Sequence, residues 1–106
     1  MFRTGIGFDS HRFVEGRPLI LGGQNIPHEK GLAGHSDADA VTHALTDAIL
    51  GAAAAGDIGS LFPETDAEWK DANSLGLLRQ ACELVRYRGF TPRQADIPVS
   101  AERPRL

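Results

Sequence analysis

The chain has 106 residues, the size of one domain with a small core. Its composition, with 42% hydrophobic and 24% charged residues, is that of a globular protein and excludes disordered, collagen-like and low-complexity classes. The net charge of -3, with lysines and arginines scattered along the chain, argues against non-specific nucleic-acid binding, so metal ions would have to supply much of the positive field for an anionic substrate.

Short strands are predicted in the first part of the chain. Residues 3–9 alternate weakly and favour a strand ending at Asp9, where two glycines would let another backbone approach closely. Residues 18–21 and 24–26, joined by a Gly-Gly turn, favour a hairpin with short arms. Residues 27–36 contain a proline and two glycines but no apolar period, so we expect a loop there.

A helix is predicted from Asp37 onwards. Ser36 with Asp39 matches a capping box, and Gly56 fits the C-terminal stop. Apolar residues recur at helical spacing in between: Ala40, Val41, Ala44, Leu45, Ala48, Ile49, Ala52 and Ala53.

The remainder predicts a loop, a second helix and a strand. Residues 57–73 suit a long functional loop, and residues 74–88 suit a helix ended by Gly89. Residues 94–101 resemble a strand, although Pro98 within them disfavours one. The inward residues of the second helix would be Leu75, Leu78, Cys82 and Val85. The order of strands, helix, loop, helix and strand leaves the sheet short of partners.

Two histidines and a carboxylate form a candidate metal site. Asp9 and His11 lie two apart, so an extended segment points both side chains to one face, and His43 could close the site from the helix. Asp39 or Asp47, one turn away on either side, could accept the other imidazole N–H of His43. The alternative is a set of capped turns with a hydrogen-bonded core histidine.

An anion site is suggested at the start of the same helix. His35 and Ser36 lie where the first free N–H groups of the helix point outward and the dipole favours negative charge. Alternatively, Ser36 simply caps the helix. His28, in a loop beside Pro27, is expected to be a solvated surface residue.

A third candidate follows the helix, where Asp57 lies between two glycines. Its carboxylate could accept hydrogen bonds from a polyol, and the loop after it could act as a lid, although aspartates are also common in turns. The chain has no Walker, CxxC, HExxH or GxSxG motif.

A cytoplasmic location is expected from three negative signals. Cys82 is the only cysteine, so an intrachain disulfide is impossible. The apolar stretch 48–55 is far shorter than a membrane span, and residues 1–15 do not match a signal peptide.

Taken together, six motifs closely resemble the 2-C-methyl-D-erythritol 2,4-cyclodiphosphate synthase family. They are Gly-Phe-Asp-Ser-His (7–11), Gly-Gly-x-x-Ile-Pro (22–27), Gly-Leu-x-Gly-His-Ser-Asp-Ala-Asp (31–39), His-Ala-Leu-Thr-Asp-Ala-Ile-Leu-Gly-Ala-Ala (43–53), Gly-Asp-Ile-Gly (56–59) and Leu-Phe-Pro-x-Thr-Asp (61–66). No single motif is diagnostic, but their common order and spacing are very specific. The resemblance extends to Leu106 and implies an α/β (α+β) sandwich, with a mixed β-sheet packed by helices on one face, in a homotrimer with active sites at subunit interfaces.

The resemblance also implies roles for particular residues. Asp9, His11 and His43 would bind zinc, and His35 would act in catalysis. Substrate contacts would come from Asp9, Ser10, His11, His35, Ser36, Asp57, Ile58, Gly59, Phe62, Pro63, Glu64, Thr65, Asp66, Ala101, Glu102, Arg103, Pro104, Arg105 and Leu106. Among these, the residues from Ala101 onward would begin the pocket for the cytidine moiety.

The implied reaction belongs to non-mevalonate isoprenoid biosynthesis. It converts 4-diphosphocytidyl-2-C-methyl-D-erythritol 2-phosphate into the cyclic diphosphate and releases CMP. Zinc would polarise the β-phosphate, and a second divalent cation, Mg²⁺ or Mn²⁺, would neutralise the diphosphate. No protein nucleophile is needed, because the attack is intramolecular.

The chain also departs from this family, whose members are longer. We expect residues 1–106 to form a single domain that lacks the family's C-terminal third, including a strand and turn with a Thr-Thr-Glu signature. Two alternatives therefore stay open: an inactive zinc-binding or assembly remnant, and a metal-dependent phosphohydrolase. The location would be the bacterial cytoplasm, or the plastid in a plant or alga.

Overall fold

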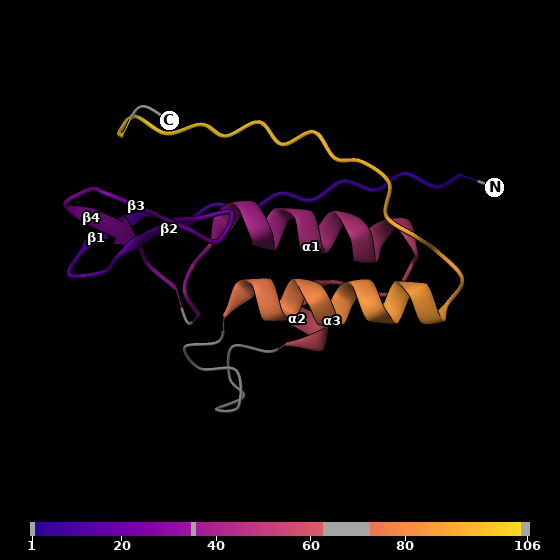
Figure 1. Ribbon diagram of the computed structural model, residues 1–106. Helices are drawn as coiled ribbons and strands as arrows, with labels where there is room; N and C mark the ends of the chain where they lie inside the picture. Colours follow the sequence, from indigo (N-terminus) through magenta and orange to yellow (C-terminus); the bar gives the residue numbers. More distant parts are fainter. Residues whose placement is uncertain (1, 35, 63–72, 105–106) are drawn as a thin grey trace.

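The computed structural model describes residues 2–34, 36–62 and 73–104, which form short antiparallel strands and three helices (Figure 1). The helices are α1 (Ala40–Ala52), α2 (Ile58–Leu61) and α3 (Ser74–Tyr87). Both long helices were predicted, whereas α2 lies in the expected loop 57–73. None of the helices in the described residues is long and apolar enough to cross a membrane.

The predicted hairpin is confirmed as β2 (Leu19–Leu21) and β3 (Gln24–Ile26), which pair antiparallel. Gly22 and Gly23 join them with φ angles of 61° and 78°, values that glycine adopts without strain and that match the twist of a two-residue hairpin.

A second antiparallel pair joins β1 (Phe13–Glu15) to β4 (Lys30–Leu32), so the prediction of a loop throughout residues 27–36 was wrong for β4. The three residues of β4 are too few to show an alternating pattern in the sequence. Gly31 has its place there because a side chain would meet the carbonyls of Arg17 and Pro18, at 2.5 and 2.3 Å from the added Cβ.

The strands predicted over 3–9 and 94–101 are not formed in the described part of the chain. Both segments are extended and run along one side of α1, but neither pairs with a neighbouring strand (Figure 1). The described residues therefore hold two separate antiparallel pairs and no mixed sheet. A strand needs backbone partners as well as an extended conformation, and local sequence specifies only the conformation.

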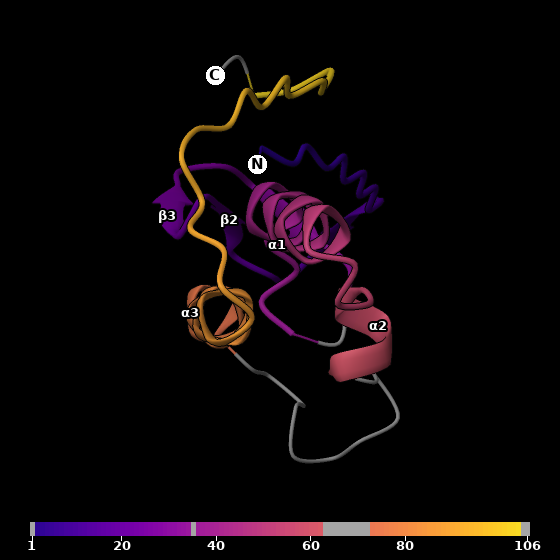
Figure 2. The same cartoon turned by 90° about the vertical axis from the view of Figure 1, so that its right-hand side faces the viewer.

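Helix α1 lies between α3 and the N-terminal segment (Figures 1 and 2). The approach of the N-terminal segment is close: a Cβ at Gly7 would lie 1.9 Å from the carbonyl oxygen of Ala44, and one at Gly5 would lie 2.0 Å from that of Ala48. The prediction that these glycines admit another backbone is confirmed. The backbone that approaches is a helix and not a strand.

The cap of α1 differs from the prediction. Asp39 and not Ser36 is the N-cap, and its carboxylate accepts the N–H of Thr42 at 3.0 Å. The chain must turn between these two residues, and Ala38 there has a φ of 57°. The capping box predicted at Ser36 is therefore wrong, because the helix begins three residues later than that residue would require.

The buried face of α3 agrees with the prediction at Val85 but differs from it elsewhere. Residues Ser74, Leu77, Ala81 and Val85 are buried, whereas Leu75 is 45% exposed. Apolar residues occur on more than one face of this helix, so periodicity could not select the face that packs on α1. In the structure, Ala81 and Val85 pack against Leu50 and Ala53 of α1 and its C-terminal end.

Candidate metal centre

Asp9, His11 and His43 each offer a ligand atom, and these atoms lie within 4.8 Å of one another. Within the described ranges, no other group of three or more His, Cys, Asp or Glu residues comes together in this way. The sequence prediction that these three side chains converge is confirmed, although the residues come from an extended segment and from a helix far along the chain.

Backbone packing explains this convergence. Asp9 and His11 are alternate residues of an extended segment, so both point to the same side. Gly7 seats that segment directly on the carbonyl of Ala44, the residue after His43. The site is thus positioned by the close contact between the N-terminal segment and the first turns of α1.

Hydrogen bonding orients the ring of His11. Its Nδ1 lies 2.5 Å from the carbonyl oxygen of Ala33, which only accepts, so Nδ1 must carry the proton. Its Nε2 faces Oδ2 of Asp9 at 2.8 Å. Gly34 leaves room for the ring, since an added Cβ would lie only 3.3 Å from Cε1 of His11. Nε2 is therefore the nitrogen available to a metal.

His43 is held in a comparable way by different partners. Its Nδ1 faces Oδ2 of Asp9 at 3.2 Å, and its Nε2 lies 2.7 Å from Oγ of Ser74 and 3.2 Å from Oγ of Ser36. The two imidazole rings are tilted at 57°, with centroids 5.7 Å apart. Both histidines therefore point one nitrogen at the same carboxylate oxygen.

The outer partners predicted for His43 were wrong. Asp39 is fully buried, and its oxygens accept the N–H groups of Gly22 and Gly23 and both donors of Thr42. Asp47 instead accepts the N–H of Ile58 at 2.6 Å. Residues one turn away share the helix face of His43, but other parts of the fold bind their carboxylates.

The electrostatics of the cluster favour a cation. Burial alone would raise the pKa of Asp9, but its hydrogen bond with His43 and the charges of both histidines lower the pKa below its ordinary value. Burial alone would lower the pKa of His43, but Asp9, Asp37 and Asp39 raise it above its ordinary value. The surroundings therefore stabilise positive charge at this point, whether it is carried by a proton or by a metal.

The donor set suits a divalent metal of the zinc type. One carboxylate and two imidazoles are common zinc ligands, and three protein ligands leave a fourth position for water or substrate. The second nitrogen of each histidine is already hydrogen-bonded, as is usual for metal-binding histidines.

The anion site predicted at Ser36 does not lie at the helix start, because α1 begins at Ala40 and the carboxylate of its N-cap Asp39 accepts the N–H of Thr42. Ser36 is buried, and its carbonyl accepts a hydrogen bond from Nη2 of Arg17 at 2.5 Å. The Nη1 of Arg17 donates to the carbonyl of Gly34. His35 lies outside the described residues. Arg17 thus binds both neighbours of His35 in the sequence, a role that no local pattern around Arg17 indicated.

The third candidate begins a short helix. Asp57 caps α2 by accepting the N–H of Ser60 at 2.8 Å, and Ile58 and Gly59 lie in its first turn. Phe62 ends α2 and donates its N–H to the carbonyl of Ile58. The predicted contacts Pro63, Glu64, Thr65 and Asp66 lie outside the described residues. Asp57 has the turn-forming role that was the alternative, and its side chain is exposed.

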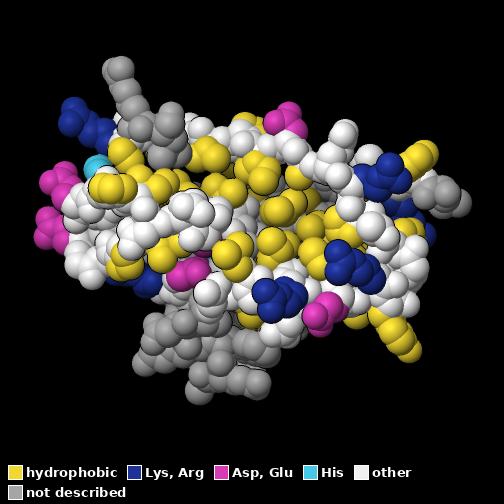
Figure 3. Space-filling view, viewed as in Figure 1, with side chains coloured by type: hydrophobic (Ala, Val, Ile, Leu, Met, Phe, Trp, Pro, Cys, Tyr) yellow, Lys and Arg dark blue, Asp and Glu magenta, His cyan; other side chains and the backbone are white. Residues whose placement is uncertain are grey.

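A large groove connects the candidate metal centre with the C-terminal segment. It has a volume of about 1540 Å³ and is lined by the N-terminal segment through His11, by α1 and by residues 89–101. Apolar side chains form a band across the face that contains the two terminal segments (Figure 3). Ser10 and Ala101 both line the groove, whereas Glu102 and Arg103 line a smaller pocket with His28. Arg105 and Leu106 lie outside the described residues.

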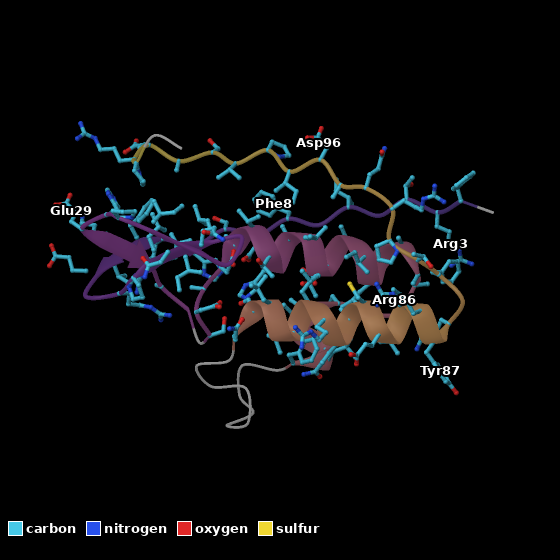
Figure 4. All side chains as sticks on the ribbon, in the orientation of Figure 1. Arg3, Phe8, Glu29, Arg86, Tyr87 and Asp96 are labelled. Carbon is cyan, nitrogen blue, oxygen red and sulfur yellow. The ribbon has the colours of Figure 1, made fainter. Side chains whose placement is uncertain are left out.

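Sequence reasoning missed Ser74 and Asp37, which continue the hydrogen bonds beyond His43. Asn73 and Ser74 are ordinary polar residues at a helix start, and Ser74 lies 31 residues from His43. No spacing rule connects residues so far apart. The outward orientation of the Tyr87 side chain, at the end of α3, is likewise seen only in the structure (Figure 4).

Comparisons with known proteins give a consistent result. A sequence model of the YgbB family matches residues 2–106. The 2-C-methyl-D-erythritol 2,4-cyclodiphosphate synthase of Salinibacter ruber is 60% identical over 104 residues, which cover 98% of this chain and 66% of that protein. The protein of the same name from Chromobacterium violaceum is 61% identical, over 100% of this chain and 67% of that protein.

A solved structure of a 2C-methyl-D-erythritol-2,4-cyclodiphosphate synthase in its CDP-bound form is also similar. It superimposes with a TM-score of 0.76 and 55% sequence identity, over 82% of this chain and 58% of that chain. The present chain spans about two thirds of the length of the curated relatives that it matches. With the family match covering nearly the whole chain, and with relatives of such high identity, the chain belongs to the YgbB family.

Proposed function

We propose that the chain carries the metal half of a 2-C-methyl-D-erythritol 2,4-cyclodiphosphate synthase. The reaction is an intramolecular phosphoryl transfer in non-mevalonate isoprenoid biosynthesis. It converts 4-diphosphocytidyl-2-C-methyl-D-erythritol 2-phosphate into the cyclic diphosphate with release of CMP, and it makes the protein a phosphorus-oxygen lyase. The observation that carries the proposal is the convergence of Asp9, His11 and His43 in a chain of this family.

The proposed resident metal is zinc, with Mg²⁺ or Mn²⁺ as the second ion. Zinc bound by these three residues would supply a Lewis acid to a phosphate oxygen. The chain's own contribution is orientation: Ala33 holds the ring of His11, and Ser74 holds that of His43. A groove beside the site gives room for an extended substrate. Orientation and charge stabilisation are what an intramolecular reaction between two anions requires.

Further residues are proposed to bind the substrate. His35 would be the catalytic residue, contacting the phosphates together with Ser36. Asp57, Ile58 and Gly59 would hold the methylerythritol portion, with the loop from Phe62 through Asp66 beside it. The remaining contacts are proposed for Ser10 and for Ala101 through Leu106, on the cytidine side. Support comes from a solved relative in its CDP-bound form.

The proposal extends to assembly and location. We propose that residues 1–106 act as one domain in a homotrimer, with active sites at the subunit interfaces, in the cytoplasm of a bacterium. The exposed apolar side chains of Phe2, Ile6 and Phe8 support a covered state for the N-terminal segment. Sedimentation velocity of the purified chain tests the assembly, and a monomer at micromolar concentration would contradict it.

An incubation with the diphosphocytidyl substrate and Mg²⁺ tests the reaction. Phosphorus NMR separates the possible products, and the proposal predicts the cyclic diphosphate and free CMP. Linear hydrolysis products would instead support a phosphohydrolase. Bound zinc without turnover would support an inactive zinc-binding remnant.

A metal analysis tests the zinc site, which the synthase, the phosphohydrolase and the inactive remnant all assume. His43→Ala should lose stoichiometric zinc, because His43 supplies one of the three ligand atoms. His28→Ala is the matched control, because the ring of His28 packs edge-on against Phe13 and lies outside the cluster. Equal zinc content in the two variants would refute the site.

A further inference from the structure

Ser74 is a buried polar residue to which the proposed reaction assigns no role. It is 0% exposed, begins α3, and places its hydroxyl 2.7 Å from Nε2 of His43. On its other side, the hydroxyl donates to Oδ1 of Asp37. The Oδ2 of Asp37 accepts the backbone N–H of Ser74 at 2.9 Å. Asp37 thus holds Ser74 by two hydrogen bonds, and Ser74 holds the imidazole.

The direction of these hydrogen bonds follows from the chemistry of the groups. A carboxylate only accepts, so the hydroxyl hydrogen of Ser74 points to Asp37. The oxygen of Ser74 is then left to accept the proton on Nε2 of His43. With Nε2 protonated, Nδ1 is the nitrogen that can give its lone pair on the side facing Asp9. The chain Asp37–Ser74–His43 therefore selects one tautomer and one ring orientation.

We propose that Ser74, held by Asp37, is a positioning residue for the metal ligand His43. The inference rests on the metal site of the proposed function and adds the residues that set its geometry. Ser36 is a weaker partner of the same nitrogen, because it lies 3.2 Å away and its oxygen also accepts the N–H of Ala38 at 3.2 Å. Loss of Ser74 should therefore not be fully replaced.

The test compares two substitutions at the start of α3. Ser74→Ala removes the hydroxyl that contacts His43, and Asn73→Ala removes the neighbouring cap, whose side chain accepts the N–H of Leu75 at 2.9 Å. Both variants weaken the helix start, but only the first touches the metal ligand. Zinc affinity is measured by competition with a chromophoric chelator, and the visible spectrum of the Co²⁺-substituted protein reports the ligand geometry.

We expect Ser74→Ala to bind zinc about 10- to 100-fold more weakly, since loss of a partner behind a metal ligand typically has this effect. Its Co²⁺ spectrum should shift, Asn73→Ala should retain both properties of the parent, and Ser74→Thr should recover most of the affinity. In a double-mutant cycle, Asp37→Asn and Ser74→Ala should be less than additive, because part of the effect of Asp37 is exerted through the hydroxyl of Ser74.

Three outcomes would overturn the inference. Equal zinc affinity in Ser74→Ala and the parent would refute the positioning role while leaving the metal site intact. An equal loss in Asn73→Ala would reassign the effect to the helix start. If the parent chain itself binds no zinc, the proposed function fails together with the inference, whereas the first two outcomes leave the metal site of the proposed function intact.

Discussion

A methyl group added at Gly7 should push the N-terminal segment away from α1 and so disturb the metal centre between them. In Gly7→Ala, the new Cβ would lie 1.9 Å from the carbonyl oxygen of Ala44 and 2.8 Å from the amide nitrogen of Ala48. Both are backbone atoms of α1, so neither can rotate away. The segment would have to retreat by about 1.5 Å to reach an ordinary contact distance.

The expected consequence is a weakened metal site. Asp9 lies two residues from Gly7, and zinc ligands tolerate only about 0.2 Å of departure from their usual bond lengths. The displacement in Gly7→Ala is several times larger than this tolerance. It should therefore lower zinc affinity by about 10- to 100-fold or more, the loss typical when a residue that hydrogen-bonds a metal ligand is removed. Chelator competition measures this loss, and far-UV circular dichroism verifies that the helices persist.

Two other glycines serve as controls. Gly5→Ala meets the same helix, with its Cβ 2.0 Å from the carbonyl of Ala48, but lies further from Asp9, so it should cost similar stability and less zinc affinity. At Gly51 of α1, the nearest atom to an added Cβ is the carbonyl oxygen of Ile6 at 3.9 Å, and Gly51→Ala should stabilise the helix by about 0.5 to 1 kcal/mol. Unchanged zinc affinity in Gly7→Ala would refute the reasoning.

Three further predictions concern stability. Asp39→Ala should lower the free energy of unfolding by about 3 to 5 kcal/mol, because four donors of the β2–β3 turn and of the first turn of α1 lose their buried acceptor. Urea unfolding measures this free energy, and a loss below about 1 kcal/mol would contradict the prediction. Burial raises the pKa of Asp47 above its ordinary value, and nearby acidic charge adds to this rise, although the hydrogen bond from Ile58 opposes it. The protonated form of Asp47 therefore stabilises the folded state below about pH 4, and this stabilisation is lost as the pH rises through the raised pKa. Asp47→Asn should therefore gain stability relative to the parent between about pH 3.5 and pH 7 in thermal unfolding, and a constant difference would be inconsistent with this. Ala54 has a φ of 53°, so Ala54→Gly should raise the free energy of unfolding by about 1 kcal/mol, and a lower thermal midpoint would argue against strain there.

Local chemistry was sufficient for part of this structure. The hairpin follows from two adjacent glycines that adopt positive φ, and α1 follows from apolar residues repeated over several turns. The Asp9 and His11 pair follows from the alternation of side chains along an extended chain. In each case the decisive interactions lie within a few residues of one another.

The partners of the site were decided by contacts between distant segments. Asp39 and Asp47 neighbour His43 on its helix, yet the turn at Gly22 and the start of α2 bind their carboxylates. Ser74 takes the place predicted for them, because α3 packs its first turn against α1. Sequence separation gives no measure of such contacts.

The amino-acid sequence by itself determined which donors this protein offers and where its two long helices lie, because residue chemistry and short-range periodicity are local properties. Only the tertiary structure decided which face of α3 is buried, that residues 3–9 lie on a helix without pairing as a strand, and that Ser74 reaches His43. Those outcomes depend on packing and hydrogen bonds between residues that are remote in the chain, where several pairings satisfy the same local pattern.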